Sequence, residues 1–178
     1  LLGVSAVSAT DIWAVGFSQD SQFGPTQTLT LHWDGTSWSV VASADASIND
    51  ELEAVAAVSS ADVWAVGQFI SGANVETLIE HWNGTSWSLV SSPAPGLLAG
   101  IAVVSPTDIW AVGSFVDPNT GVTSTVIEQW NGTSWSQVSS PNPGASENIL
   151  DGAVADPTTG QAWAVGVFNG GPLIEVNP

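Results

Sequence analysis

The eight-residue segment HWNGTSWS, residues 81–88, occurs three times in this chain with small changes. It returns as HWDGTSWS at residues 32–39 and as QWNGTSWS at residues 129–136. A second segment ending in WAVG occurs four times, with its tryptophans at positions 13, 64, 110 and 163. The chain is therefore a tandem repeat with a unit of about fifty residues, a length typical of propeller blades.

Each unit contains four short segments with the character of β-strands. In the second unit they are residues 52–59, 62–69, 77–82 and 85–90. Turn-forming residues separate them, and Asn83-Gly84 between the last two is a strong hairpin signal. No stretch has a convincing helical period. The fourth unit supplies only the first three segments.

The apolar pattern orders the four strands from the centre of the fold to its edge. The first strand carries a small residue at one repeated position, which suits a crowded centre: Gly3, Ala54, Gly100 and Gly152. The second and third strands are apolar on both faces, as in a covered sheet, and the fourth alternates. We predict an all-β, single-domain β-propeller of four-stranded antiparallel blades, the last lacking its outer strand, with boundaries near 1–43, 44–92, 93–141 and 142–178.

Three further repeated positions carry a family resemblance. They are a glycine in the second strand (Gly16, Gly67, Gly113, Gly166), a tryptophan ending the third (Trp33, Trp82, Trp130) and a tryptophan opening the fourth (Trp38, Trp87, Trp135). With them the unit resembles the kelch-like, galactose-oxidase-like propeller repeat of secreted bacterial proteins. A kelch repeat has a second glycine after the first, and this chain does not. The resemblance implies an extracellular protein, either secreted or on the cell surface.

Charge and composition exclude several partners. The 178 residues include no Lys or Arg and 17 Asp and Glu, for a net charge of −17. Without cations the chain cannot neutralise phosphates, so we expect no nucleic-acid binding and no attraction to anionic lipid. No apolar run is long enough for a membrane helix, so no membrane insertion is expected. The chain begins at Leu1 and has no cysteine; we expect a processed form or an excised piece.

The repeated polar residues allow either a structural or a chemical reading. His32 and His81 share one slot with Gln129, and Glu80 shares another with Glu128, Glu175 and Leu31. A carboxylate pair could perform glycosidase chemistry, but residues that recur with the repeat favour architecture. Asp11, Asp62 and Asp108 are predicted to cap turns together with serines three residues earlier. We therefore predict no catalytic residues and no cofactor.

Three weaker candidate sites remain. The acidic segment at residues 45–53 could hold calcium through Asp45, Asp50, Glu51 and Glu53, although the usual ligand spacing is absent. Asn83 and Asn131 match the N-glycosylation pattern, which the turn alone also explains. The fourth-strand tryptophans could act as sugar platforms: Trp38, Trp87 and Trp135.

The favoured function is a non-catalytic extracellular scaffold. Its variable segments join the second and third strands, at residues 18–27, 70–76 and 116–124, where recognition of a protein or glycan partner is expected. A carbohydrate-binding propeller is the first alternative, and a Glu/Asp-dependent glycoside hydrolase is the second. We also expect self-association or another strand to complete the last blade. Mutual repulsion of the carboxylates should raise their pKa values, so stability should increase on acidification.

Overall fold

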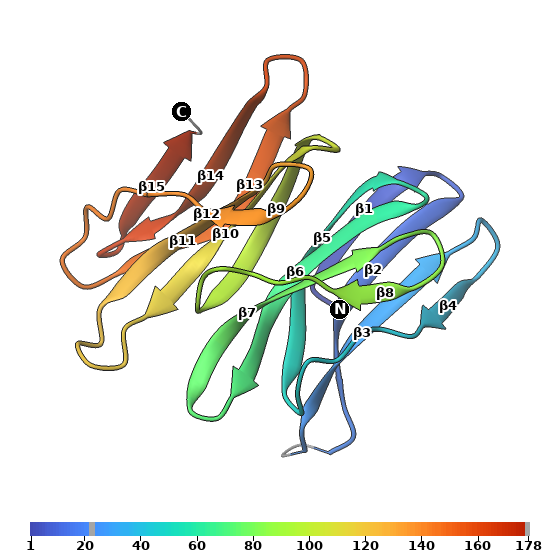
Figure 1. Ribbon diagram of the computed structural model, residues 1–178, viewed down its shortest axis with the longest axis horizontal. Coiled ribbons are helices and arrows are strands. Elements are labelled where there is room, and N and C mark those ends of the chain that lie inside the picture. Colours follow the sequence, from blue (N-terminus) through green and yellow to red (C-terminus); the bar gives the residue numbers. More distant parts are fainter. Residues whose placement is uncertain (22–23, 177–178) are drawn as a thin grey trace.

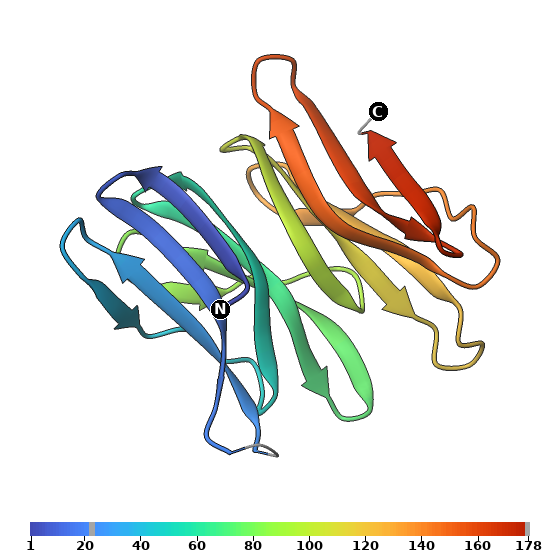
Figure 2. The same ribbon diagram turned by 180° about the vertical axis from the view of Figure 1, so that it is seen from behind.

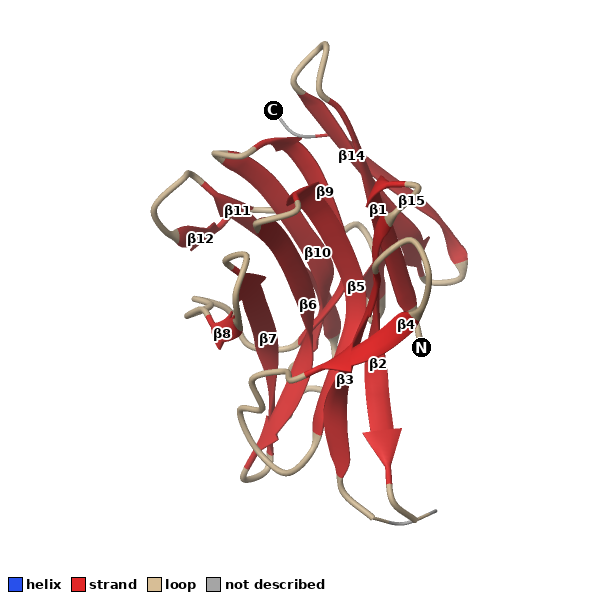
Figure 3. Cartoon of the chain, turned by 90° about the vertical axis from the view of Figure 1, so that its right-hand side faces the viewer, coloured by secondary structure: helices blue, strands red, loops and turns tan. Residues whose placement is uncertain are grey.

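The computed structural model describes residues 1–21 and 24–176. Among these residues there are strands and no helix, and therefore no helix that could cross a membrane (Figure 3). The fifteen strands are β1 (Gly3–Ser8), β2 (Asp11–Gln19), β3 (Thr26–Trp33), β4 (Trp38–Val41), β5 (Asp50–Ser59), β6 (Asp62–Ser71), β7 (Asn74–Trp82), β8 (Trp87–Leu89), β9 (Leu97–Ser105), β10 (Asp108–Val116), β11 (Thr123–Trp130), β12 (Trp135–Gln137), β13 (Asn148–Asp156), β14 (Gln161–Phe168) and β15 (Gly171–Val176).

The strands form four antiparallel sheets, each made of strands consecutive in the chain. The orders are β1-β2-β3-β4, β5-β6-β7-β8, β9-β10-β11-β12 and β13-β14-β15. These sheets, blades 1 to 4, follow one another in chain order (Figure 1), and the view from behind shows the same succession (Figure 2). The predicted fold class is confirmed, including a last blade with three described strands.

The first strands of neighbouring blades meet at the small residues that the sequence singled out. A Cβ added to Gly3 would lie 3.0 Å from the Ala54 backbone, and one on Gly100 would lie 2.8 Å from the Gly152 Cα. The predicted crowding of this region is therefore present. A larger side chain at these positions would push adjacent blades apart.

The repeated glycine of the second strand has a local cause. In β5 a bulge lies between Leu52 and Ala54, opposite Gly67 of β6. This irregularity brings the Glu51 carbonyl oxygen to within 1.9 Å of where a Gly67 Cβ would sit, and Gly113 and Gly166 face the same obstacle. The glycine is thus required by the neighbouring strand.

The turn of the repeated octet is more elaborate than the Asn-Gly signal indicates. Gly84 alone has a positive φ, of 92°, while the Asn83 side chain accepts hydrogen bonds from the backbone N–H groups of Thr85 and Ser86 and from the Thr85 hydroxyl. Asp34 and Asn131 accept the same set in their own blades. The octet therefore repeats its Thr and Ser because both are donors in this turn.

Apolar side chains fill the spaces between the blades. We call the face of a blade that points to the following blade its trailing face, and the opposite one its leading face. Val66 and Ile79 on the trailing face of blade 2 are 0% and 1% exposed, because blade 3 covers them. Their equivalents in blade 4, Val165 and Ile174, are 49% and 68% exposed. These two positions of the trailing face are therefore buried in blade 2, which another blade follows, and exposed in blade 4.

Candidate functional site

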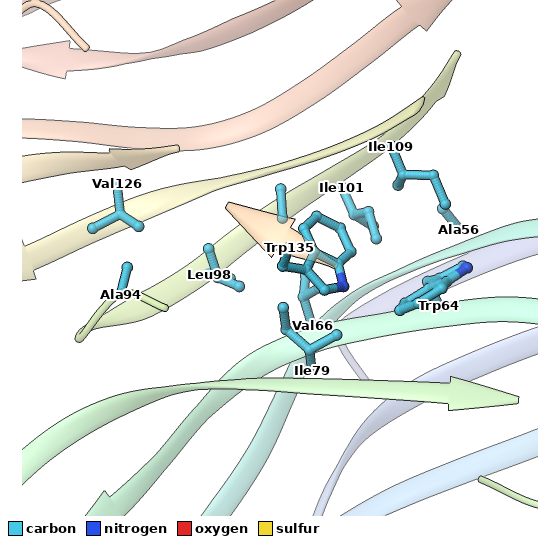
Figure 4. Packing of buried hydrophobic residues seen from close by; sticks show 11 residues of the cluster. Ala56, Trp64, Val66, Ile79, Ala94, Leu98, Ile101, Ile109, Val126 and Trp135 are labelled. Carbon is cyan, nitrogen blue, oxygen red and sulfur yellow. The ribbon is translucent and has the colours of Figure 1, made fainter. Parts of the chain in front are cut away.

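The tryptophans of the octet hold each blade to the one before it. Trp82 and Trp87 of blade 2 contact Trp13 of blade 1, with ring centroids 4.9 and 5.2 Å apart. In the next interface the rings of Trp130 and Trp135 lie 4.8 and 5.5 Å from that of Trp64. Figure 4 shows Trp135 inserted among the apolar side chains of this interface, beside Trp64. These four tryptophans therefore pack between neighbouring blades.

This packing corrects the sugar-platform prediction at two of its three positions. Trp87 and Trp135 are each 6% exposed, and a ring covered by the preceding blade offers no face to a sugar. Trp38 is 46% exposed because no described blade precedes it. Only Trp38 keeps an accessible ring.

The two histidines form separate, equivalent pairs with aspartates of the second strand. His32 Nε2 lies 2.8 Å from Asp11 Oδ1, and His81 Nε2 lies 2.8 Å from Asp62 Oδ1. In blade 3, Gln129 Nε2 donates to Asp108 at 2.9 Å. An amide serves as well as an imidazole in this slot, so the geometry favours the structural reading.

The aspartates themselves do not cap the turns that precede them, contrary to the sequence prediction. The serines do so alone: Ser59 Oγ accepts from the Ala61 N–H, and Ser8 and Ser105 make equivalent bonds. Burial raises the pKa of Asp11, but hydrogen bonds from Ser60 and His32 outweigh burial, and its pKa lies below the ordinary value. The aspartates fix the strand pair β2–β3 and its equivalents.

Replacing His81 with glutamine should leave the fold and its stability nearly unchanged, within about 0.5–1 kcal/mol, because Gln129 already makes the equivalent bond. His81→Leu should cost about 1–3 kcal/mol because it leaves Asp62 without this donor. Urea denaturation of both variants checks the prediction. A glutamine variant as unstable as the leucine variant would show that the imidazole has a role that the amide cannot fill.

The repeated glutamates bind serines of the preceding blade's exit segment. Ser43 Oγ donates to Glu80 at 2.7 Å, Ser92 Oγ to Glu128 at 2.6 Å, and Ser140 Oγ to Glu175 at 2.7 Å. Each bond joins a serine at the end of one blade to a glutamate of the next, with 35 to 37 positions between them in the chain, and so ties two blades together. The three cavities described for the structure have one acidic residue each in their linings, Glu175 in the first and Glu76 in the other two. No pair suited to glycosidase chemistry is among these linings.

Burial raises the pKa values of these glutamates. Desolvation raises the pKa of Glu80 to about 7, against the lowering effect of its bonds from Ser43 and the Ala44 N–H. Burial likewise raises the pKa values of Glu128 and Glu175. One carboxyl oxygen of each has no hydrogen-bond partner, which is consistent with a neutral acid in an apolar interface.

Three of the four calcium candidates accept hydrogen bonds from neighbouring residues of the chain. Asp50 is buried and accepts hydrogen bonds from the Ala46 and Ser47 N–H groups and the Ser47 hydroxyl. Asp45 accepts from the Thr28 N–H and hydroxyl, and Glu51 accepts from Gln68. Burial raises the pKa of Glu53, as does the charge of Glu51. Within residues 1–21 and 24–176 no group of three or more acidic, His or Cys residues is placed to hold a metal.

A groove lies where the second and third strands of blades 2 and 3 are joined. Its cavity of about 460 Å³ is lined on its apolar side by Val75, Pro95, Phe115, Val116 and Pro118. Val75 and Val116 expose their side chains to solvent. Sequence reasoning placed recognition at these connections, although Ser71 pairs with Asn74, so the connection in blade 2 is a tight turn. The corresponding segment of blade 1 includes residues 22–23, which lie outside the described residues.

Comparisons with known proteins identify the architecture. No family model matches the chain, and no curated protein matches it. Among solved structures it is similar to "YCF48 bound to D1 peptide", with 17% identity and a TM-score of 0.51 over 92% of this chain and 44% of that chain. The chain thus spans less than half the length of this structural relative. That relative is a β-propeller, and the likeness, with the four consecutive antiparallel sheets, assigns this chain to the β-propeller fold.

Proposed function

We propose that this chain is a non-catalytic interaction scaffold that binds a protein partner through the groove between blades 2 and 3. The proposal rests on a contrast. The repeated polar residues form hydrogen bonds within and between blades, whereas this groove presents apolar side chains to solvent. The solved propeller that carries a bound peptide supports a peptide partner here. Loops on a rigid sheet frame are a common place for recognition.

Charge indicates the chemistry of the partner. The chain has no Lys or Arg and 17 acidic residues, and Glu76 contributes to the lining of the groove. A partner segment with apolar side chains flanked by Lys or Arg would complement both the groove and the acidic surroundings. The same composition leaves no cleavage site for proteases that cut after Lys or Arg, which supports a location outside the cell.

A library of ten-residue peptides, selected for binding to the 178-residue chain, tests this function. The enriched peptides should place Lys or Arg beside an apolar residue. A Val75→Ser, Val116→Ser double variant should bind them at least about tenfold more weakly. The control is Val40→Ser, which changes a valine of blade 1 that is more exposed than either groove valine. Equal binding by the groove variant and the wild type would contradict the proposal.

Carbohydrate binding is the second candidate function, because the ring of Trp38 is exposed to solvent. A glycan array probed with the wild-type chain and with Trp38→Ala separates the two functions. A glycan bound by the wild type and lost in the variant would favour the lectin, whereas a scaffold gives no such difference.

A further inference from the structure

The octet turn directs three donors at one side-chain oxygen in blades 2 and 3. The Asn83 Oδ1 accepts from the Thr85 N–H at 3.0 Å, from the Thr85 hydroxyl at 2.7 Å and from the Ser86 N–H at 3.1 Å. The Asn131 Oδ1 accepts the equivalent three bonds at 2.9, 2.7 and 3.0 Å. Donors that converge on a carbonyl oxygen stabilise negative charge that develops on it. The turn is therefore a small oxyanion hole built around an asparagine side chain.

A backbone nitrogen stands directly after each of these asparagines. Gly84 follows Asn83 and is exposed, and no group within residues 1–21 and 24–176 accepts a hydrogen bond from its N–H. Glycine is required here because its φ is 92° and because a Cβ on Gly84 would lie 2.9 Å from the Ala61 Cβ. The same requirement leaves the nitrogen without a side chain that could shield it. The turn thus places an unhindered nitrogen next to an activated amide carbonyl.

Blade 1 already carries, at the same position, the residue that hydrolysis of an asparagine amide would produce. Asp34 accepts the equivalent bonds from the N–H and hydroxyl of Thr36 and from the Ser37 N–H, at 2.8, 2.6 and 2.9 Å. These bonds lower the pKa of Asp34 to about 2, so the turn stabilises the carboxylate. The glycines that follow residues 34 and 83 have φ values of 94° and 92°. An aspartate made from Asn83 therefore fits the same backbone.

We propose that Asn83 and Asn131 are sites of spontaneous deamidation, which converts the turns of blades 2 and 3 to the aspartate form that blade 1 already has. The Gly84 nitrogen gives its proton to water and bonds to Cγ of Asn83, whose amide nitrogen takes up a proton and leaves as ammonia. Water then adds to Cγ of the resulting succinimide ring, the bond from Cγ to the Gly84 nitrogen breaks, and that nitrogen regains a proton. Each conversion consumes one water, releases one ammonia and adds one negative charge. This modification is independent of the proposed scaffold function.

The three donors also determine which product forms. Water can open the succinimide at Cγ, which gives aspartate, or at the main-chain carbonyl of residue 83, which gives isoaspartate. The turn directs its donors at the oxygen on Cγ, so the folded chain gives mainly aspartate. Isoaspartate adds an atom to the main chain between β7 and β8, where the Asn83 N–H donates to the Ser86 carbonyl at 3.3 Å. The folded turn therefore opposes the second product.

A third Asn-Gly pair, Asn169-Gly170, lies outside the octet and serves as a comparison within the same molecule. Its Oδ1 accepts longer bonds, of 3.2 to 3.4 Å, from the N–H and hydroxyl of Ser146 and from the Glu147 N–H. Because these bonds are longer, Asn169 should convert more slowly than either octet asparagine. Conversion at Asn169 that is as fast as at the octet sites would contradict activation by the octet turn.

Mass spectrometry of the folded 178-residue chain, incubated at mildly alkaline pH, tests the proposal. A protease that cuts after glutamate separates the two octet sites, because Glu128 lies between them. Asn83 and Asn131 should both convert with time, mainly to aspartate. A synthetic peptide of residues 81–90 is the unfolded reference and should give a larger share of isoaspartate. Octet sites that stay intact while the peptide converts, or an isoaspartate share equal to that of the peptide, would overturn the proposal.

Two variants test the part that the turn plays. Thr85→Val removes the hydroxyl donor and should slow conversion of Asn83 at least about threefold, whereas Thr85→Ser keeps the donor and should convert at nearly the wild-type rate. Asn131 of the same molecule is the matched control, and its rate should not change in either variant. Equal rates at Asn83 in the two variants would refute activation by the turn. If Thr85→Val does not fold, the folded chain and the peptide still decide the question.

Discussion

Replacing Trp64 with alanine is expected to lower the free energy of unfolding by about 3–5 kcal/mol, the usual cost of removing a large buried aromatic side chain. Trp64 is buried between blades 2 and 3 against two tryptophans and the ring of His81. For a chain of this length the loss corresponds to about 10 °C in melting temperature. Urea denaturation followed by tryptophan fluorescence measures it.

Trp163→Ala is the matched control, because Trp163 has the same place in its repeat but no described blade covers it. It should cost about 1 kcal/mol or less. Equal losses in the two variants would contradict the conclusion that the following blade determines the contribution of this position. The exposed Val165 and Ile174 beside Trp163 show the same absence of cover.

The stability of the protein is expected to fall as the pH rises from about 4.5 to 7. Burial raises the pKa of Glu80 from 4.5 to about 7, so the folded state binds this proton more tightly than the unfolded chain does. Its contribution is complete below pH 4.5 and is lost as pH rises through the folded-state value; at 1.36 kcal/mol per unit the loss is roughly 3 kcal/mol. Glu128 and Glu175 act in the same direction.

Other carboxylates make the protein less stable when the pH falls below about 4. Hydrogen bonds from Thr36 and Ser37 lower the pKa of Asp34 to about 2, and similar bonds lower the pKa values of Asp117 and Asp156. Their stabilising effect is present above the unfolded value near 4 and disappears as the pH falls through the folded one. Stability should therefore pass through a maximum near pH 4–5. The sequence alone predicted a continuing rise on acidification, from charge repulsion.

The variant Glu80→Gln separates burial from general repulsion. Glutamine has nearly the same shape and carries no charge, so the variant should exceed the wild type in stability at pH 8 by up to about 3 kcal/mol and match it near pH 4.5. Thermal melts at low salt from pH 3 to 8 give the comparison. A wild type and variant with parallel profiles would show that Glu80 does not titrate in the folded protein near pH 7.

The sequence predicted the features that depend on one repeat unit. The spacing of the tryptophans predicted the blades, and Asn-Gly predicted the hairpin turn. The bulge opposite the repeated glycine was not predicted, because it lies in the neighbouring strand. The contacts between different units could not be predicted in the same way. The bond from Ser43 to Glu80 joins residues 37 apart in the chain, and neither residue has a local signal that predicts it.

The sequence pattern also could not predict which of the octet tryptophans is exposed to solvent. Trp38, Trp87 and Trp135 all stand in the same segment GTSWS, yet only Trp38 is exposed. The difference comes from which blade lies in front of each ring, and not from the residues beside it.

The central claim is that the octet tryptophans hold each blade to the one before it, and a double-mutant cycle tests it most directly. Trp64→Ala, Trp135→Ala and the double variant are compared by urea denaturation. Trp64 and Trp38 serve as the control pair, because Trp38 is exposed on blade 1 and is not among the rings that contact Trp64. The claim predicts a coupling of about 0.5–1.5 kcal/mol for Trp64 with Trp135 and additivity for the control. Losses for Trp64 and Trp135 that add to within about 0.3 kcal/mol would contradict it.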